Sequence, residues 1–457
     1  MLLKEKLLYF FASLVMLLSL ISCEKDKDDD NDFETCKWIH DNMSVVYYWR
    51  EQIPDMEHVA ASDPKKYFSS LLSEKDKWSY ITDDYSAVNK KSTSELTATM
   101  GFRPSFFLVE ANKIIMVVSY VYPGSAAEES GLKRGDIILT VDNKVMNTSD
   151  YYEVFSGSKY SVQLGRLAGN TLYPTGVSLN LSAKMISGDP AIYHSVINVN
   201  GRKLGYLVYV EFLSGEENEF RDNLDAIFTE FNAAGISDLI VDLRYNPGGK
   251  GEEARHLASA IAPYSVVQEK ESLVKLEYNG QLSNLLIAEN MEDRFEYKFT
   301  GDVVNLDLDR VFFLTTPETA SASELVITGL EPYMEVIQIG DTTAGKCYGS
   351  WSIPDKNEEW AIFPIVFKYS NLEGFTDFTD GLAPDYYMKD NIFEARPFGD
   401  ISDPMLGKAV ELASGMVIET QQTAVLKSTQ SFTSIIPYQM ELKKRLVFDG
   451  IGSLRGN

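Results

Sequence analysis

The sequence is poor in the residues that build disulfide frameworks and metal centres, with three cysteines and four histidines among 457 residues. Apart from Cys23, only Cys36 and Cys347 remain, and two cysteines do not make a disulfide framework. The chain has no Cys/His cluster with zinc-type spacing and no P-loop or Rossmann glycine pattern. We therefore predict neither a metal nor a cofactor.

Basic side chains are also scarce, because 42 lysines and arginines face 67 acidic residues and give a net charge of −25. A nucleic-acid-binding surface needs the opposite sign, so this class of partner is excluded. The negative charge weakly disfavours acidic substrates, although its simplest role is solubility. An apolar content of 44% is that of an ordinary globular protein, and the length suits two to four domains.

The N-terminus lacks a stretch long enough for a stable membrane span, since the apolar run Leu7–Ile21 is short. Lys4 and Lys6 precede this run, as in a signal peptide. The segment Leu20–Cys23 that ends it resembles a bacterial lipobox, whose lipidated cysteine becomes the mature N-terminus. Lipidation of Cys23 would tether the protein to the cell envelope, and we expect the outer membrane, facing the periplasm or the cell surface. The alternative is an uncleaved N-terminal anchor.

Two segments of different composition follow the lipobox. Residues 24–32 are strongly acidic, which predicts a solvated linker and resembles a surface-export signal of some Gram-negative lipoproteins. Residues 33–95 carry helical periodicity and many aromatic side chains, and Asp63-Pro64 is typical of a helix start. This pattern predicts a helical region whose aromatic residues pack in a core.

Residues 96–185 resemble a PDZ domain. The stretch from Val121 to Val141 predicts a strand, a short helix that ends at Gly131, and a second strand after the Gly135-Asp136 turn. A second segment resembles the carboxylate-binding loop before the peptide-accepting strand, and it consists of Met100, Gly101, Phe102 and Arg103. PDZ domains bind peptides by adding a strand to the edge of a sheet. Alternatively, this domain only packs or regulates.

Residues 186–412 alternate between buried strands and amphipathic helices, which indicates a layered α/β core. Strands are expected at Lys203–Phe212 and Asp238–Arg244, with the helix Glu217–Ala234 between them. Residues 413–457 carry little signal and are interpreted as a C-terminal extension.

The most informative segment is Thr319–Glu324, which lies between an apolar strand pattern at Arg310–Thr315 and a helix pattern at Glu324–Leu330. A serine at such a turn can present its hydroxyl beside the backbone N–H groups of a helix N-terminus. This arrangement suits a nucleophile whose product is an oxyanion. Lys346 follows Ser321 after 25 positions (346 − 321), behind Gly345.

These motifs resemble those of the C-terminal processing peptidases, or tail-specific proteases, which are serine peptidases with a Ser–Lys dyad and a PDZ domain. The resemblance extends over most of the chain after about residue 35 and implies a multidomain, mixed α/β (α+β) protein. It also implies a ClpP/crotonase-like protease core, a PDZ domain and an N-terminal helical region. The segment Asp380–Asp385 is similar to a late turn of the same family.

The resemblance also assigns roles to residues. Ser321 would be the nucleophile and Lys346 the base, while Gly248 or Gly249 and Ala322 would donate backbone N–H groups to the oxyanion. Lysine can act as a base only when neutral, so its pKa must fall by several units through burial. The expected activity is that of an endopeptidase acting on protein or peptide substrates, which the PDZ domain would select by their C-termini.

Some features leave alternatives open. The family often has a glutamine four residues after the lysine, where this sequence has Ser350, whose shorter side chain would have to orient Lys346. His256 is a rival base and Cys347 a rival nucleophile, although we interpret them as a packed or surface histidine and an apolar filler. The alternative function is a catalytically weak or inactive PDZ scaffold that binds peptides or proteins. The oligomeric state is not predicted.

Overall fold

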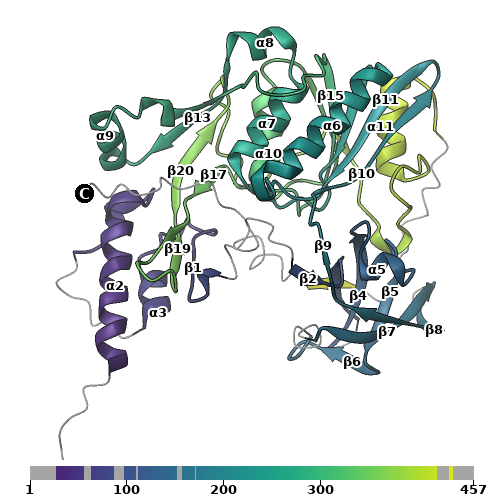
Figure 1. Cartoon of the computed structure of the whole chain (residues 1–457), viewed down its shortest axis with the longest axis horizontal. Coiled ribbons are helices and arrows are strands. Elements are labelled where there is room, and N and C mark those ends of the chain that lie inside the picture. The colour runs from purple at the N-terminus through teal and green to yellow at the C-terminus, as the bar shows by residue number, and fades with distance from the viewer. Residues whose placement is uncertain are drawn as a thin grey trace, which may run out of the picture.

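The computed structural model describes residues 27–55, 63–86, 97–109, 112–151, 157–169, 171–418 and 432–435. It has an α/β core, a β-rich domain below it and an N-terminal helical part beside them (Figure 1). The predicted lipidation site Cys23 lies outside the described residues. Within the described ranges, no helix is both long and apolar enough to cross a membrane.

The core is built on a six-stranded sheet with the order β10-β11-β12-β15-β16-β21. Only the β10–β11 pair is antiparallel among these described strands, and the other four pairs are parallel. The strands are β10 (Ala191–Val199), β11 (Arg202–Tyr209), β12 (Asp238–Asp242), β15 (Arg310–Thr315), β16 (Glu335–Gly340) and β21 (Tyr386–Tyr387). The two central strands, β12 and β15, consist mainly of hydrophobic residues, as expected for parallel strands covered on both faces.

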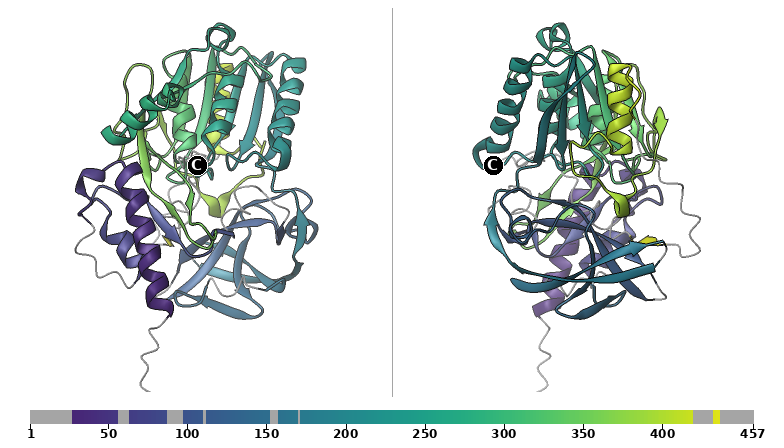
Figure 2. Two further views of the ribbon diagram at one scale, coloured as in Figure 1. Left: turned by 60° about the vertical axis from the view of Figure 1, so that its left-hand side comes forward. Right: turned by 90° about the vertical axis from the view of Figure 1, so that its right-hand side faces the viewer.

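Helices cover both faces of this sheet (Figure 2). Leu239 and Val241 of β12 pack with one set of helices, whereas Ile240 between them packs on the opposite side, because side chains alternate along a strand. The first face is covered by α6 (Glu219–Ala234), α7 (Gly251–Ile261) and α10 (Ala322–Leu330), and the second by α11 (Pro404–Ser414). The apolar stripe predicted for the first of these helices is buried: Phe220, Leu224, Ile227, Phe228 and Phe231.

A second layer of strands extends from the core toward the N-terminal part. The four-stranded sheet β14-β13-β20-β17 consists of β14 (Glu296–Lys298), β13 (Ser272–Tyr278), β20 (Ile365–Ser370) and β17 (Tyr348–Ser350). A three-stranded sheet joins β1 (Tyr80–Thr82) to β19 (Ala361–Phe363) and β18 (Ile353–Pro354). The N-terminal part is therefore continuous in sheet pairing with the core. The chain also has the short helices α8 (Tyr264–Glu269), α9 (Gly280–Ala288), η4 (Glu216–Asn218), η5 (Glu292–Phe295) and η6 (Ile392–Glu394).

The N-terminal part consists of α2 (Lys27–Val46), η1 (Arg50–Gln52), α3 (Pro64–Ser70) and β1. Asp63 caps α3 by accepting from two backbone N–H groups, as its place before Pro64 predicts. Residues 27–32, which the charge pattern predicts as a linker, instead form the start of α2. Acidic residues are favoured in the first turn of a helix because they face the positive end of its dipole.

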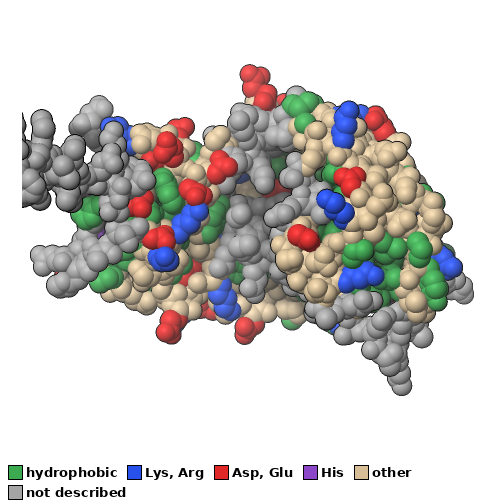
Figure 3. Space-filling view, turned by 90° about the horizontal axis from the view of Figure 1, so that it is seen from below, with side chains coloured by type: hydrophobic (Ala, Val, Ile, Leu, Met, Phe, Trp, Pro, Cys, Tyr) green, Lys and Arg blue, Asp and Glu red, His purple; other side chains and the backbone are tan. Residues whose placement is uncertain are grey.

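The β-rich domain has a seven-stranded sheet with the order β22-β3-β4-β6-β5-β7-β8. Its elements are β3 (Phe102–Leu108), β4 (Lys113–Val121), α5 (Ala126–Glu129), β5 (Ile137–Val141), β6 (Lys144–Asn147), β7 (Lys159–Ala168), β8 (Thr171–Ser182) and β22 (Thr433–Ile435). The strands β2 (Thr97–Thr99) and β9 (Lys184–Ile186) form an antiparallel pair where the chain enters and leaves this domain. Acidic and basic side chains are interspersed on the face seen from below (Figure 3).

Candidate active site

Three neighbouring parallel strands direct their carboxyl ends to one place. The strands β12, β15 and β16 lie side by side, and the segments that follow them carry Gly249, Ser321 and Lys346. Because parallel strands end at the same edge of a sheet, residues far apart in the sequence meet there. Local patterns predicted the serine, glycine and lysine motifs, and the sheet order explains why they converge.

Ser321 has a strained backbone at the turn into α10. Its φ of 54° and ψ of −106° are unusual for a residue with a side chain, and it occupies the N-cap position of the helix. The residue exposes none of its surface, and its hydroxyl has no hydrogen-bond partner among the described residues. Strain and an unpaired buried hydroxyl both cost free energy, so they are a signature of a functional position.

The carboxylate of Glu324 links the serine turn to the lysine loop. One of its oxygens accepts from the backbone N–H of Ser321 at 2.7 Å and from that of Lys346 at 2.9 Å. The other accepts from Thr343 Oγ1 at 2.5 Å and from Gly345 N–H at 2.7 Å. Burial raises the pKa of the Glu324 carboxyl, and these four hydrogen bonds oppose the rise. A single side chain thus fixes the two loops relative to each other.

A tyrosine also contacts both segments of this junction. The hydroxyl of Tyr369 on β20 lies 3.2 Å from the carbonyl oxygen of Ser321 and 3.2 Å from that of Lys346. The ring is buried, and burial raises the pKa of the Tyr369 hydroxyl well above its usual value, so the group remains a donor.

Lys346 is buried, with 1% of its surface exposed. Burial lowers the pKa of its ammonium group from 10.5 to about 7, while the negative charges of Asp76 and Glu324 partly oppose this shift. The Nζ atom lies 5.6 Å from the ring centroid of Trp78, which belongs to the N-terminal part. A large fraction of the lysine is therefore neutral near pH 7, as a base requires.

The turn that carries Trp78 is held by Asp76. One carboxylate oxygen accepts from the backbone N–H groups of Trp78 and Ser79 at 2.9 Å each, and the other accepts from Tyr47 Oη at 2.9 Å. The tyrosine lies on the segment that follows α2, so the N-terminal part positions both the ring and the carboxylate that act on Lys346.

The loop after β12 has the backbone geometry of an anion-binding turn. Gly248 and Gly249 have φ values of 105° and 142°, and a Cβ on Gly249 would meet the carbonyl oxygen of Phe212 at 2.3 Å. The N–H of Gly248 donates to Asn246 Oδ1 at 2.9 Å. The N–H groups of Gly249 and Ala322 are paired with no acceptor among the described residues, so the geometry favours these two as donors to a ligand.

Asn246 joins this loop to the serine turn. Its carbonyl oxygen accepts from Ala320 N–H at 3.1 Å and from Ser323 Oγ at 3.1 Å, and its side-chain amide donates to Tyr209 O at 2.9 Å. The second serine of the motif thus has a structural hydrogen bond, in contrast to the unpaired hydroxyl of Ser321.

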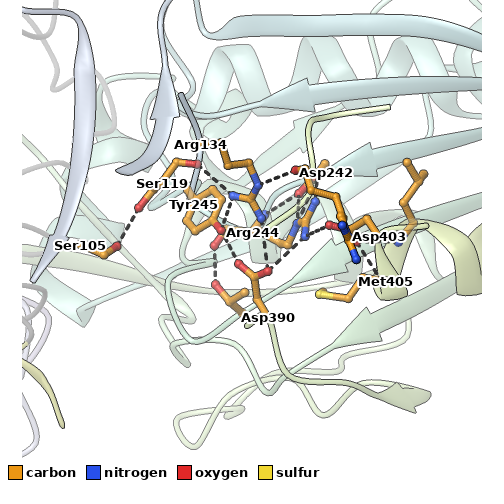
Figure 4. Close-up of polar contacts among 12 residues, drawn as sticks. Ser105, Ser119, Arg134, Asp242, Arg244, Tyr245, Asp390, Asp403 and Met405 are labelled. Carbon is orange, nitrogen blue, oxygen red and sulfur yellow. Dashed lines mark hydrogen bonds and ion pairs between the residues drawn. The ribbon is translucent and has the colours of Figure 1, made fainter. Parts of the chain in front are cut away.

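A buried ionic network supports the same loop (Figure 4). The guanidinium of Arg244 is 1% exposed and contacts Asp242 at 2.7 Å, Asp403 at 2.9 Å and Asp390 at 3.2 Å. Asp390 also binds Arg134 of the β-rich domain, at 3.3 Å. Removing one member of a buried pair leaves an uncompensated charge and costs about 3–5 kcal/mol. These contacts give Arg244 and Asp242 a structural role beneath the loop.

The predicted carboxylate-binding loop contacts the core through Arg103. Its guanidinium donates to Tyr245 O at 2.6 Å and binds the carboxylate of Glu318 at 2.7 Å, three residues before Ser321. The backbone of the loop is held by α5, because Ala127 N–H donates to Met100 O at 2.9 Å. Its role in peptide binding stays a prediction.

The rival groups lie in other environments. His256 is buried on α7 and binds Asp225 at 2.9 Å. Burial raises the pKa of the Cys347 thiol to about 11, which disfavours a nucleophilic thiolate. Ser350 is buried at the end of β17, and among the described residues no hydrogen bond joins its hydroxyl to Lys346, so its orienting role stays a prediction.

Sequence reasoning missed several residues that shape the site: Asp76, Trp78, Asn246, Glu324 and Tyr369. Glu324 belongs to the quoted motif, and its place three residues after a helix-capping serine was a usable signal. The two residues from the N-terminal part had none, because no local pattern indicates contact with a lysine loop so far along the chain.

A serine at a strained turn, backbone donors and a buried lysine form the kind of site found in serine peptidases. The sequence profile of peptidase family S41 matches residues 203–388, that of the peptidase S41 N-terminal domain matches 34–80, and that of a PDZ domain matches 117–162. The chain belongs to peptidase family S41. The fold class predicted from the sequence is confirmed.

Individual relatives agree with this assignment. The chain is 26% identical over 239 residues to the carboxy-terminal processing protease CtpA of Bacillus subtilis, covering 51% of this chain and 44% of that protein. It is 23% identical over 392 residues to a carboxy-terminal-processing protease of Bartonella bacilliformis, covering 83% and 82% of the two chains. The crystal structure of an S41 protease from Bacteroides fragilis superposes with a TM-score of 0.69 at 26% identity, covering 83% of this chain and 97% of that one. The chain spans about half the length of the Bacillus subtilis relative.

Proposed function

We propose that the protein is a serine endopeptidase that cleaves protein or peptide substrates with a Ser321–Lys346 dyad. The observation that carries this proposal is the burial of Lys346 on a loop that Glu324 ties to the Ser321 turn. Burial keeps the lysine partly neutral near pH 7, and the shared Glu324 carboxylate holds its loop beside the turn of Ser321, whose hydroxyl it would deprotonate.

The reaction would begin when neutral Lys346 accepts the proton of the Ser321 hydroxyl. The serine oxygen then attacks the carbonyl carbon of the scissile peptide, and the resulting oxyanion is held by the N–H groups of Gly249 and Ala322. When the C–N bond breaks, the lysine returns its proton to the leaving amine. Water then attacks the acyl-enzyme ester while Lys346 accepts a proton from it. The ester C–O bond breaks, the lysine returns this proton to the Ser321 oxygen, and the product acid leaves.

Substrate must gain access to the hydroxyl before this chemistry, because Ser321 exposes none of its surface in the structure. The proposed cycle therefore includes a movement that opens the site. Among the residues near it, Trp78 over Lys346 and Arg103 beside Glu318 come from outside the α/β core.

The test is labelling with a fluorophosphonate probe, which reacts with activated serine hydroxyls. We expect a single modified peptide that contains Ser321, and loss of labelling in Ser321→Ala. Labelling of Ser323, or no labelling together with no hydrolysis of a casein substrate, would reject the assignment.

The second candidate function is a peptide-binding scaffold with weak or no catalysis. Two observations favour it: Ser350 stands where the family often has a glutamine, and Ser321 is buried. Peptide binding without turnover in the same protein preparation would select this alternative.

We further propose that Cys23 is lipidated and that the protein is anchored in the cell envelope, at the outer membrane. The lipobox-like segment Leu20–Cys23 supports this placement. Mass spectrometry of the protein from membranes of the producing cell should find a diacylated or triacylated Cys23 at the mature N-terminus.

A further inference from the structure

The strand β3 of the PDZ domain is already paired on the side that faces away from β4. Its partner there is β22, a short strand from the C-terminal extension, with the register Thr433↔Leu108, Ser434↔Phe107 and Ile435↔Phe106. The sheet order places β22 at the edge, next to β3. The C-terminal extension, to which sequence reasoning assigned no role, thus supplies a strand to the PDZ sheet.

The direction of this strand is informative. The pairing is antiparallel, so the chain runs from Leu108 back toward Phe102 at the start of β3. Gly101 and Met100, in the loop predicted to receive a peptide carboxylate, lie directly before that start. A peptide added as a strand to this edge, with its C-terminus toward the loop, would have the same direction.

An aromatic contact marks the beginning of the paired segment. The ring of Phe432 lies 5.0 Å from that of Phe393, which in turn lies 4.8 Å from the ring of Phe107 on β3. Aromatic pairs at such distances add stability beyond the backbone pairing. The segment is therefore fastened both by its backbone register and by one side chain.

The outer edge of β3 is where the resemblance to a PDZ domain predicts peptide binding, and we propose that residues 432–435 of the same chain occupy this edge as its resident strand. An incoming peptide must displace this segment, so residues 432–435 compete with external peptides for the same edge of β3. If the segment occupies the edge nine-tenths of the time, the apparent affinity for an external peptide falls about tenfold.

The proposal concerns binding and is independent of catalysis, so every measurement uses the Ser321→Ala protein. The probe is a dye-labelled synthetic peptide with the sequence of residues 431–437, and its binding to the full chain is followed by fluorescence anisotropy. Thr433→Pro/Ser434→Pro removes two successive backbone N–H groups, one of which must point toward β3 whichever residue is hydrogen-bonded. The matched control, Thr433→Ala/Ser434→Ala, keeps both N–H groups.

We expect the double-proline protein to bind the probe about tenfold more tightly than the unaltered chain, and the double-alanine control to lie near the unaltered chain. Equal affinity in all three proteins would refute the proposal that residues 432–435 occupy this edge. Failure of the probe to bind even the double-proline protein would show that the outer edge of β3 does not bind this peptide and would refute the proposal.

A crosslink tests the same contact from the opposite direction. Leu108 and Thr433 are register partners, so Leu108→Cys/Thr433→Cys should form a disulfide under mild oxidation, while the native Cys36 and Cys347 are buried. The oxidised protein should lose probe binding and regain it on reduction. It should remain a monomer on a non-reducing gel, whereas a crosslinked dimer would show that the segment comes from a second copy and would refute the proposal. Probe binding that is unchanged by the crosslink would also refute it.

Discussion

The backbone N–H of Lys346 donates a hydrogen bond of 2.9 Å to the buried carboxylate of Glu324. The same carboxylate oxygen binds the N–H of Ser321, so the proposed base and nucleophile share one acceptor. Their separation then depends on a single rigid side chain on α10 rather than on two independent loops. The first prediction concerns this carboxylate.

Glu324→Gln should reduce turnover more than it changes the KM for a peptide substrate. A glutamine amide keeps one acceptor oxygen for the N–H groups of Ser321 and Lys346 and turns its own N–H groups toward Thr343 and Gly345. The Thr343 hydroxyl can accept from them, but the Gly345 N–H loses a buried hydrogen bond at a cost of about 1–3 kcal/mol. Steady-state kinetics and thermal unfolding measure the two effects. Glu335→Gln, at an exposed residue on β16, is the control. Unchanged kcat in a destabilised Glu324→Gln protein would mean that Glu324 has only a structural role.

The two serines of the motif should respond in opposite ways to replacement by alanine. Ser321→Ala should abolish hydrolysis without lowering the melting temperature, because its hydroxyl makes no hydrogen bond among the described residues. Ser323→Ala removes the bond to Asn246 O and should cost about 1 kcal/mol of stability while retaining activity. Peptidase assays with differential scanning fluorimetry compare them. Full activity of Ser321→Ala would exclude it as the nucleophile.

Activity should rise with pH through the pKa of Lys346, which is about 7. Below this pH the ammonium form predominates and cannot accept a proton, so log(kcat/KM) should fall with decreasing pH. Lys346→Arg should be nearly as inactive as Lys346→Ala, because a guanidinium does not lose its proton at accessible pH. An active arginine variant with a flat pH profile would exclude the lysine as base.

The same pKa predicts a stability effect that does not depend on activity. The unfolded chain holds the Lys346 proton up to about pH 10.5 and the folded chain only up to about 7, so the unfolded state binds more protons between these values. Stability should therefore rise with pH across this window. Lys346→Met should be more stable than the native protein at pH 7 and below, and this gain should shrink as the pH approaches 10. Denaturant titrations at several pH values measure the difference.

Gly249→Ala should abolish activity and destabilise the fold. A Cβ at this position would lie 2.3 Å from the Phe212 carbonyl oxygen, at a φ of 142° that side chains rarely adopt, so the backbone N–H would have to move. Gly235→Ala is the matched control, because this glycine also has a positive φ, of 67°, but nothing lies within 4 Å of the added carbon. The control should retain activity, at a cost of about 1 kcal/mol. An active Gly249→Ala protein would remove this residue from the oxyanion site.

Local patterns predicted those parts of the site that lie within single segments. The apolar run of β15, the serine turn after it and the glycine pair after β12 are each readable over a few residues. Contacts between segments were not readable: Trp78 reaches Lys346, and Tyr369 reaches both Ser321 and Lys346, because segments far apart in the sequence lie together in the fold. The pairing of residues 433–435 with β3 was missed for the same reason, since an edge strand this short has no periodicity of its own.

The last prediction tests the contribution of the N-terminal part to the base. The negative charge of Asp76 raises the pKa of Lys346 against the effect of burial, so Asp76→Asn should move the acid limb of the kcat/KM profile to lower pH. The asparagine oxygen can still accept from the N–H groups of Trp78 and Ser79, which keeps the turn in place. The control is Asp83→Asn, an exposed partner of Lys65 in the same part of the chain, which should leave the limb unchanged.

Replacement of the Trp78 ring distinguishes an effect on the pKa of Lys346 from an effect on folding alone. Trp78→Phe keeps an aromatic face over Nζ and should retain a limb near pH 7, whereas Trp78→Ala admits water, weakens the desolvation that lowers the pKa and should move the limb to higher pH. A merely structural tryptophan would lower the amount of folded enzyme without moving the limb, because the fraction of folded protein changes the height of a pH profile and leaves its midpoint in place. The midpoint could stay fixed in all three variants, Asp76→Asn, Trp78→Phe and Trp78→Ala. This result would show that the N-terminal part does not influence the pKa of Lys346.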